Sequence, residues 1–490
     1  MSSVFVYLRD GIFTFNDIMV YINIFIIFLL IFFQKREPVT IFLWIFVLIF
    51  IPIAGFIFYI FLGQQIYKEK RFHYKELEEI LSKHSFHSKT SIKSYDSFLL
   101  DDSTENFKEI IKYNFNVSKA VYSDNNDVEI FTDGLEKFDS LKKDLLKAKK
   151  YIYFQYYIIK DDIVFRSIIP ILKQKAKEGV KVCIIYDGMG CRLIKNKVWK
   201  DLEKSGIETV SFFPPILGQF NVRANYRNHR KIVVIDGHVG YIGGFNVGKE
   251  YISLDKRFGY WRDTHLKIVG EAVSSIEMRF VMDWNYATNK ISRRLKFKFN
   301  KLYPSSKNKV GIQVISSGPD LTEPIIRDNI IKMISLAKKS VKIQTPYFIL
   351  DEAMMTALKI ALHSGVDVQI MIPNKADHPV VNSASRYFAG QLIELGAKCY
   401  EYTKGFIHAK SVVIDDTICT VGTANMDIRS FKLNFEVNAV IFDKEVSKKL
   451  GDAFNNDTND SILVTLQDYR KRGIFRRGKE MFARLFSPIL

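Results

Sequence analysis

Asn228–Asn246 reads NHRKIVVIDGHVGYIGGFN, and Ile407–Asn425 reads IHAKSVVIDDTICTVGTAN. In both stretches a histidine is followed by a lysine after two residues, an aspartate after seven and an asparagine after seventeen. These residues are His229, Lys231, Asp236 and Asn246 in the first stretch, and His408, Lys410, Asp415 and Asn425 in the second. Five of the nine histidines have lysine at the second position after them, but only these two also have aspartate at the seventh. The chain therefore contains one motif twice.

The sequence before each copy repeats as well. Helical segments alternate with the apolar strands YIYFQYYII and VKVCIIYDG before the first copy, and with VKIQTPYFIL and VDVQIMIPN before the second. Alternation of this kind is typical of α/β domains, and its recurrence indicates an internal duplication. The 490-residue chain is long enough for two such domains. We predict two α/β halves, residues 121–300 and 301–470, each with a mixed sheet flanked by helices.

Each copy of the motif predicts a β-hairpin. Asp236-Gly237 and Asp415-Asp416 interrupt runs of β-branched residues and are expected to form the turns. A turn centred on the first dipeptide would set His229 opposite Gly244. Histidine and lysine, two residues apart, point to the same face of a strand, and the glycines near the hairpin end are expected to leave room for a ligand.

An imidazole, an ammonium and an amide on one hairpin suit a phosphodiester. Lysine supplies positive charge, asparagine a neutral donor, and histidine a nucleophile or proton carrier that works near neutral pH. Two hairpins that face each other would place a nucleophile on one side of the phosphorus and an acid on the other. Their lysines and asparagines would surround the non-bridging oxygens and stabilise developing charge.

The N-terminal segment, residues 1–66, predicts a membrane hairpin. Val39–Leu62 has no formal charge and is long enough for a helix that crosses a bilayer. Ile18–Phe33 is apolar apart from Asn23 but slightly short for a span. We expect transmembrane helices at about 12–33 and 39–62, with an interfacial or re-entrant segment as the alternative for the first.

The flanking cations predict the orientation of this hairpin. The link between the helices carries two cations, whereas the outer flanks carry Arg9, Lys68, Lys70, Arg71 and Lys75. This balance favours a multi-pass protein of the cell membrane whose large C-terminal part is cytoplasmic. The four cysteines show no metal-type spacing and are expected to be reduced thiols.

The formal net charge of +18 predicts an anionic partner, either nucleic acid or an anionic membrane surface. The membrane hairpin favours the membrane. Residues 67–120 are expected to form a membrane-proximal connector. Two basic segments remain, and each has two readings: residues 291–304 either contact lipid or form a solvated linker, and residues 471–490 form an amphipathic helix that lies on the membrane or packs against the second half.

The motif HxKxxxxD, present twice with a following GG or GT and an asparagine, resembles the phospholipase D superfamily. Within it the chain is similar to bacterial cardiolipin synthases along nearly its full length, including the segments GGFNVGKEY, WRDTH, SGPD, TPYFI, GFIHAK and GTANMDIRSFKLNFEVN. The resemblance implies that two phosphatidylglycerol molecules react to give cardiolipin and glycerol. It also implies a phosphatidyl-histidine intermediate, and neither metal nor cofactor. Nucleic acid is not expected as a partner, and the oligomeric state stays open.

The resemblance also implies roles for individual residues. By analogy His229 is the nucleophile and His408 the general acid, although the sequence is nearly symmetric. The phosphate would be held by Lys231, Lys410, Asn246 and Asn425. A carboxylate that orients each histidine is expected at Asp263 in WRDTH and at Glu436 in NFEVN, although Asp263 lies farther along the chain from the histidine of its half than Glu436 does. Asp236 and Asp415 belong to the motif, and the residues leave open whether they act in catalysis or hold the turn.

Other readings share the same site. A phospholipase D hydrolase would pass the phosphatidyl group to water, and a nuclease would act on another phosphodiester. The remaining HxK pairs, at His73, His87 and His265, are expected to be surface pairs.

Overall fold

The computed structural model describes residues 2–33, 38–63, 105–214, 226–288, 291–297, 306–321, 323–375 and 377–487. The chain divides into two compact units, one of residues 1–67 and 214–226, and the other of residues 68–213 and 227–490. The larger unit contains both copies of the repeated motif. We call its two α/β parts the first half and the second half.

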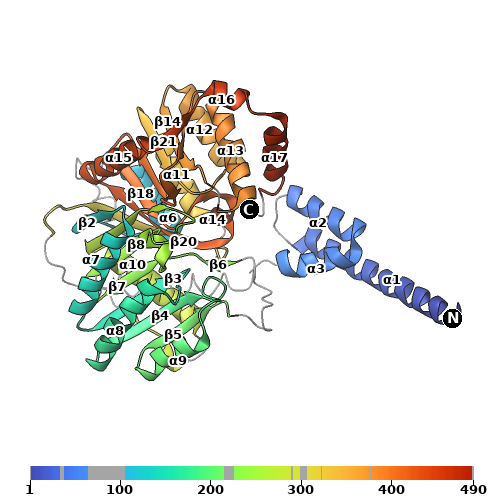
Figure 1. The fold of residues 1–490 in the computed structure, drawn as a ribbon, viewed down its shortest axis with the longest axis horizontal. Helices are drawn as coiled ribbons and strands as arrows, with labels where there is room; N and C mark the ends of the chain where they lie inside the picture. Colours follow the sequence, from blue (N-terminus) through green and yellow to red (C-terminus); the bar gives the residue numbers. More distant parts are fainter. Residues whose placement is uncertain are drawn as a thin grey trace. The chain divides into compact units, whose positions relative to one another are not determined.

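The first half is a mixed seven-stranded sheet with helices on both faces (Figure 1). The strands, in spatial order, are β2 (Asn126–Phe131), β10 (His265–Gly270), β8 (Val239–Gly243), β7 (Ile232–Ile235), β3 (Tyr151–Tyr156), β4 (Lys181–Asp187) and β5 (Glu208–Phe212). Its main helices are α7 (Gly134–Lys147), α8 (Ile163–Lys177), α9 (Asn196–Lys204) and α10 (Val273–Ala287). Strands β3, β4 and β5 are parallel, and the other pairs are antiparallel.

Alternating residues of β3 show why this half is layered. Ile152 and Phe154 pack in the core that α7 and α8 cover. Tyr153 points to the opposite face, where its ring stacks on Phe280 of α10 at 4.7 Å. Because successive side chains of a strand point to opposite faces, an apolar strand such as β3 needs helices on both.

The second half repeats this architecture with additions at both edges. Its strands, in spatial order, are β1 (Tyr122–Ser123), β11 (Gly311–Ser317), β20 (Asn434–Phe442), β18 (Ile418–Gly422), β17 (Ser411–Ile414), β12 (Ser340–Gln344), β14 (Asp367–Pro373), β15 (Lys398–Tyr402) and β21 (Ser461–Val464). Its helices include α6 (Lys108–Ser118), α11 (Ile325–Ser335), α12 (Glu352–His363), α13 (Pro379–Ile393), α14 (Ile428–Lys432), α15 (Lys444–Thr458), α16 (Leu466–Arg470) and α17 (Ile474–Arg484). The predicted pair of mixed-sheet α/β domains is thus confirmed.

The predicted connector is shorter than residues 67–120, because α6 and β1 belong to the second half. Ile110 and Ile111 of α6 are fully buried in the core of that half. Asn114 donates from its amide to Gln313 at 3.0 Å, and Tyr122 pairs with Gln313 in the sheet. The apolar pair on one face of α6 explains this packing. Residues 67–104, with His73 and His87, lie outside the described residues.

The smaller unit contains α1 (Ser2–Phe33), α2 (Pro38–Phe50) and α3 (Pro52–Leu62). The prediction of one continuous helix over 39–62 is wrong, because the helix is interrupted at Ile51, between α2 and α3. Pro52 has no N–H for the carbonyl of Leu48, four residues earlier. The buried amide of Asn23 in α1 donates to that carbonyl at 3.0 Å and to the carbonyl of Pro52 at 2.9 Å. Within the described ranges, none of the helices has the combination of length and hydropathy that a membrane crossing requires.

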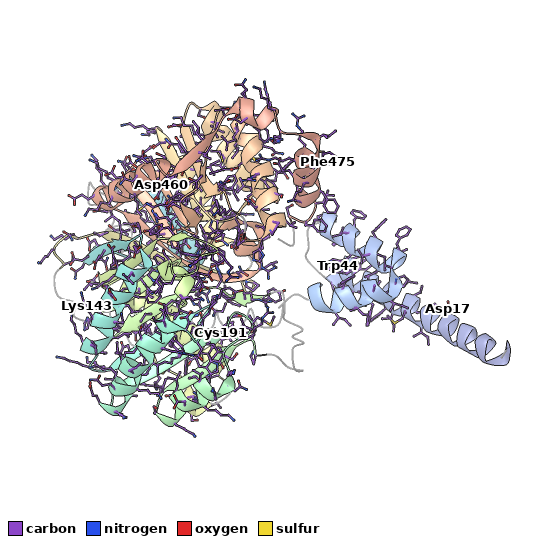
Figure 2. The ribbon with its side chains drawn as sticks, in the orientation of Figure 1. Asp17, Trp44, Lys143, Cys191, Asp460 and Phe475 are labelled. Carbon is purple, nitrogen blue, oxygen red and sulfur yellow. The ribbon has the colours of Figure 1, made fainter. Side chains whose placement is uncertain are left out.

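All four cysteines are buried free thiols, as predicted from their spacing: Cys183, Cys191, Cys399 and Cys419. Cys191 lies inside the first half (Figure 2), where its sulfur accepts the N–H of Ile159 at 3.1 Å.

The basic segment 291–304 is described only up to residue 297. There Arg293 pairs with Glu208 at 3.1 Å and Leu295 is buried, so this part packs on the first half.

Candidate active site

Two short strand pairs join the halves. In one, β6 (Arg227–Asn228) of the first half runs parallel to the start of β20 in the second. In the other, β16 (Gly405–Ile407) of the second half runs parallel to β9 (Tyr260–Arg262) of the first. Each histidine of the repeated motif follows directly after one of these exchanged strands. The two motif copies are thereby brought together at the junction.

Both motif copies form the predicted hairpins, β7–β8 and β17–β18, but the register differs by one residue. Ile232 pairs with Ile242 rather than with Tyr241, because the turn has three residues after Ile235 instead of two. Asp236 adopts a left-handed backbone with φ of 54° to make that turn. His229 therefore does not face Gly244 as expected.

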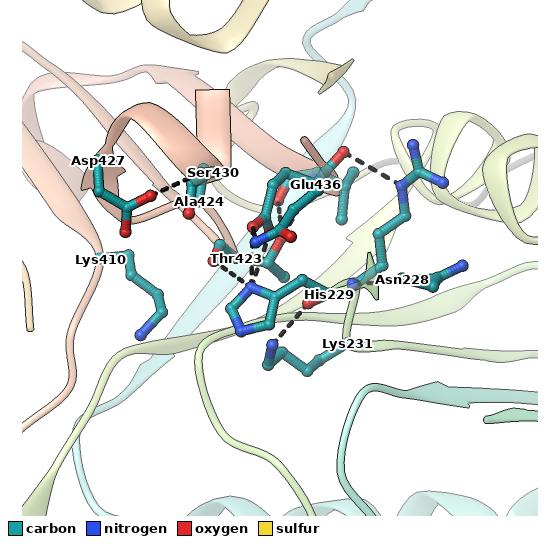
Figure 3. Close-up of polar contacts among 12 residues, drawn as sticks. Asn228, His229, Lys231, Lys410, Thr423, Ala424, Asp427, Ser430 and Glu436 are labelled. Carbon is teal, nitrogen blue, oxygen red and sulfur yellow. Dashed lines mark hydrogen bonds and ion pairs between the residues drawn. The ribbon is translucent and has the colours of Figure 1, made fainter. Parts of the chain in front are cut away.

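A carboxylate from the opposite half holds each motif histidine. The N–H of His229 donates to the carbonyl of Phe435 at 3.0 Å, and its Nδ1 lies 2.9 Å from Glu436 Oε1 (Figure 3). The second copy mirrors this arrangement. The N–H of His408 donates to the carbonyl of Arg262 at 2.7 Å, and its Nδ1 lies 2.6 Å from Asp263 Oδ2.

The structure thus corrects the pairing assumed in the sequence. Asp263 and Glu436 are the carboxylates beside the histidines, but each serves the histidine of the other half. The strand exchange explains the crossing, because the residue that accepts each histidine N–H directly precedes the carboxylate. The unequal sequence separations within each half therefore have no bearing on the two contacts.

The charges in the site fix one tautomer of each imidazole. Burial alone raises the pKa of Glu436, but the adjoining His229 and Lys231 outweigh it and leave that pKa below its usual value. The same balance, with His408 and Lys410, lowers the pKa of Asp263. Both carboxyl groups are therefore ionised, and an ionised carboxylate accepts a hydrogen bond from the Nδ1–H of its partner, which keeps the proton on Nδ1.

Burial also keeps the imidazoles neutral. It lowers the pKa of His229 and of His408 to about 4, despite the neighbouring carboxylates that raise both values. Each neutral ring carries its proton on Nδ1, so Nε2 has a free lone pair. A nitrogen in this state is suited to attack phosphorus or to accept a proton.

The two motif lysines are fully enclosed. Lys231 Nζ donates to the carbonyl of His229 at 2.6 Å, and Lys410 Nζ to that of His408 at 2.5 Å. Burial lowers the pKa of Lys410 to about 8 and that of Lys231 well below its usual value. Each lysine also acts electrostatically on the histidine of the other half. An ammonium has three N–H donors, so each retains donors for a bound anion.

The motif asparagines also hold nearby protein groups. Asn246 accepts the N–H of Ile158 at 3.0 Å and donates to the Tyr251 hydroxyl at 3.2 Å. Asn425 hydrogen-bonds to Asp427, a residue that sequence reasoning missed. Burial raises the pKa of Asp427 to about 6, and its charge acts on Lys410. Its position two residues after Asn425, next to the motif, is the sequence feature that could have pointed to Asp427 as a site residue.

Asp236 and Asp415 hold the turns and stay away from the reacting groups. The Asp236 carboxylate accepts the N–H groups of Lys149, Lys150 and Tyr151 at 2.7 to 2.9 Å. The Asp415 carboxylate accepts those of Lys338, Lys339 and Ser340 at 2.7 to 2.8 Å. These bonds fasten each hairpin turn to the start of the neighbouring strand. These contacts support the structural reading of both aspartates.

Two further expectations are corrected. A Cβ on Gly244 would lie 1.9 Å from Asp263 Oδ1, and one on Gly422 would lie 2.1 Å from Asn438 Oδ1. The glycines make room for the protein's own side chains instead of a ligand. His265 is fully buried rather than a surface residue, because β10 lies inside the sheet between β2 and β8.

Aromatic rings enclose both imidazoles. The ring of Tyr157 lies 4.8 Å from that of His229 in an edge arrangement, and 5.3 Å from Lys231 Nζ. Trp261 lies 5.1 Å from His408. His229 is 9% exposed and His408 is 8% exposed. A phosphodiester bound here would be largely withdrawn from water, where electrostatic interactions are strong.

A family model described as cardiolipin synthase, PLD-like domain, matches residues 141–284 and 330–458. The chain belongs to the cardiolipin synthase family. The two matched segments include both hairpins and both histidines. A second model, described as phospholipase D-nuclease N-terminal, matches residues 22–64.

Members of the cardiolipin synthase family align along almost the whole chain. A cardiolipin synthase of Oceanobacillus iheyensis is 43% identical over 475 residues, which cover 96% of this chain and 97% of that protein. One of Staphylococcus aureus is 45% identical over 476 residues, covering 96% and 95%. A phosphatidylserine synthase of Haemophilus influenzae has a similar fold, with a TM-score of 0.59 at 15% identity over 78% of this chain and 99% of that one.

Proposed function

We propose that His229 is the nucleophile and His408 the general acid and base in the synthesis of cardiolipin from two molecules of phosphatidylglycerol. As a cardiolipin synthase, the chain is a transferase of phospholipid biosynthesis that moves a phosphatidyl group by phospholipase D chemistry. The observation that carries the proposal is the pair of neutral imidazoles, each held through Nδ1 by an ionised carboxylate. Both Nε2 atoms are left for the reaction.

In the first step Nε2 of His229 attacks the phosphorus of one phosphatidylglycerol. The P–N bond forms while the bond from phosphorus to the headgroup glycerol oxygen breaks. His408, protonated in the loaded site, gives its proton to that oxygen, and glycerol leaves. The products of this step are free glycerol and a phosphatidyl group bound to His229.

In the second step a hydroxyl of the second phosphatidylglycerol attacks the same phosphorus. Its proton passes to Nε2 of His408, the P–N bond breaks, and cardiolipin forms. His408 is then protonated again and His229 neutral, as they were before the first step. The hydroxyl replaces water as the acceptor, which is the only difference between transfer and hydrolysis.

The histidines are assigned from the way each is held. Nδ1 of His229 lies 2.9 and 3.0 Å from the two oxygens of Glu436, and 3.1 Å from the carbonyl of Thr423. A phosphorylated imidazole that keeps its Nδ1 proton is a cation, so three oxygens around that proton support the covalent intermediate. His408 Nδ1 contacts one oxygen of Asp263.

Lys231 and Lys410 are assigned to the non-bridging phosphate oxygens, with Asn246 and Asn425 as neutral donors. The pKa of each lysine is lowered by burial, and a bound phosphodiester anion would favour its charged form again. The same anion would favour the proton that His408 needs in the first step. Substrate binding and the active protonation state are therefore coupled.

Two assays test this function. Purified protein is incubated with phosphatidylglycerol in the presence of EDTA, and the lipids are analysed. We expect cardiolipin and glycerol in equal amounts. Phosphatidic acid in place of cardiolipin would establish hydrolysis instead, and loss of turnover in EDTA would show a metal requirement.

The second assay addresses the nucleophile. Phosphatidylglycerol labelled in its phosphate is mixed with His229→Ala and His408→Ala proteins, and covalently bound label is measured after quenching. We expect label on the His408→Ala protein, where the intermediate forms slowly and persists, and none on His229→Ala. The reverse pattern would assign the nucleophile to His408.

We also propose that the smaller unit attaches the enzyme to the cell membrane with its larger unit in the cytoplasm. The support is the apolar, exposed surface of its helices, which includes Phe25, Phe32, Phe42, Phe46 and Phe50. The cations around the helices favour this orientation. Whether the chain crosses twice, as the sequence predicts, is open to a labelling test.

Because the four native cysteines are buried, an introduced cysteine reports its own side of the membrane. In whole cells, a membrane-impermeant thiol reagent is expected to label Gln34→Cys in the helix link. Lys143→Cys, at an exposed position of α7, should react only after permeabilisation. Reaction of both, or of neither, before permeabilisation would contradict the two-pass arrangement.

A further inference from the structure

Helix α17 presents a row of large apolar side chains to the outside. Phe475 is 92% exposed and projects from the helix (Figure 2), and Ile474 is 80% exposed. Met481, Phe482 and Leu485 continue the row at helical spacing, each more than half exposed. Contiguous apolar surface of this kind on a folded protein indicates an interaction site. We call these five residues the α17 face.

The opposite side of α17 is packed, so the helix is held in place. Ala483 is buried against Ile349 and Ala384. The buried carboxylate of Glu480 accepts a hydrogen bond from Arg476 at 3.1 Å and forms an ion pair with Arg472 at 3.1 Å. The structure confirms the packing reading for one side of this helix. The membrane reading stays a prediction for the exposed side.

Cations surround the α17 face. Between residues 470 and 484 the chain has seven cations, Arg470, Lys471, Arg472, Arg476, Arg477, Lys479 and Arg484, against the single carboxylate of Glu480. Arg477 and Lys479 are exposed on the helix itself. A helix with an apolar row flanked by lysine and arginine is suited to the interface of an anionic bilayer, where apolar side chains enter the acyl region and cations meet the headgroups.

Close packing connects this helix to the active site. Ile349, which Ala483 contacts, belongs to β13 (Phe348–Ile349), and β13 pairs with β19 (Met426–Asp427). Ile349 lies opposite Asp427, whose charge acts on Lys410 (Figure 3). Only one strand pair therefore separates α17 from the residue that acts on the motif lysine. A bilayer against α17 would lie beside the edge of the site that includes Asp427.

We propose that the α17 face inserts into an anionic lipid bilayer and holds the adjoining edge of the active site at its surface. The choice of an anionic lipid rests on the proposed action on phosphatidylglycerol. The acyl chains of the substrate could then stay in the bilayer while its phosphate reaches the histidines. This function is distinct from membrane attachment by the N-terminal helices, because it positions the active site instead of merely retaining the protein.

The test compares two variants of the full chain. The double variant Phe475→Ser/Phe482→Ser removes apolar area from the α17 face. The control, Leu193→Ser, removes a residue that is 82% exposed in the first half. Each protein is assayed on vesicles of phosphatidylglycerol in phosphatidylcholine, and on short-chain phosphatidylglycerol dissolved as monomers.

We expect the double variant to raise the apparent KM for vesicles by at least about tenfold, because two inserted aromatic side chains are lost. Its turnover on the monomeric lipid should equal that of the parent protein, which also shows that it is folded. Leu193→Ser should change neither value. An unchanged vesicle KM in the double variant would overturn the proposal. If the parent protein made no cardiolipin from either lipid, the proposed function would fail instead.

A probe on the helix separates the bilayer from other occupants. Phe475→Cys is labelled with a dye whose emission shifts to the blue in apolar surroundings, since the native cysteines are buried. We expect the shift on addition of phosphatidylglycerol vesicles and a smaller one with pure phosphatidylcholine. A blue-shifted dye before lipid is added would mean that protein covers the face. If the double variant also had a lower mass in solution than the parent protein, the covering protein would be a second copy of this chain. A blue shift before lipid is added, with or without this change of mass, would overturn the proposal.

Discussion

Nδ1 of His229 in the first half lies 2.9 Å from Oε1 of Glu436 in the second. In the second contact the halves are exchanged: Nδ1 of His408 in the second half lies 2.6 Å from Oδ2 of Asp263 in the first. Each half therefore has a nucleophilic nitrogen but lacks the carboxylate that fixes its tautomer. The duplication cannot be read as two independent sites, because either half alone would hold an unoriented imidazole and an unpaired buried carboxylate. The strands that cross the junction, β6 and β16, keep the two halves in one arrangement.

Replacing Glu436 by glutamine should lower kcat by about ten- to a hundredfold, the usual effect of losing a group that orients a reactive histidine. The neutral amide cannot stabilise a cationic His229, so KM should change less than kcat. Glu277→Gln is the matched control, since this glutamate is also buried but contacts Tyr151 away from the histidines. Equal losses in the two variants would refute the specific role of Glu436.

The sequence predicts the repeat and the two hairpins correctly, because each depends on local pattern. His229 and Lys231 share a face for the reason that any residues at i and i+2 do. The crossing of Asp263 and Glu436 depends on which strand each histidine follows in space, and no local spacing records that. The same holds for α6, because nothing in the local sequence of the predicted connector indicates that this segment packs in the second half.

The pH dependence of kcat/KM should report the charge state of Lys410. Its pKa is lowered to about 8 by burial, so the ammonium form prevails below that pH and the neutral amine above it. If the charge holds phosphate, kcat/KM should fall by about tenfold per pH unit above about 8. A guanidinium stays charged throughout this range, so Lys410→Arg should lack this decline even if its overall activity is low. The same decline in both proteins would assign it to another group.

Asp236→Asn should destabilise the fold and leave the chemistry intact. Its carboxylate accepts three main-chain N–H groups, and the amide can replace only part of them. We expect the free energy of unfolding to fall by about 1.5–3 kcal/mol, as for lost hydrogen bonds to a charged group. The kcat of the folded enzyme should stay within about threefold of the parent value. Asp415→Asn, at the equivalent turn, should behave alike, whereas a collapse of kcat without loss of stability would restore a catalytic role.

Asn23 should stabilise the break between α2 and α3 because Pro52 leaves the Leu48 carbonyl without a helical donor. The amide of Asn23 satisfies the carbonyl of Leu48, for which proline offers no N–H, and also that of Pro52. Asn23→Ala would remove the donor to the Leu48 carbonyl, so hydrogen exchange across residues 38–62 should become faster. Adding Pro52→Ala supplies an N–H for Leu48 and should restore part of the protection. Asn23→Ala removes the donor to the Leu48 carbonyl, and Pro52→Ala removes the need for that donor, so the two effects should be non-additive. Simple addition of the two effects would mean that the bond does not hold the break between α2 and α3.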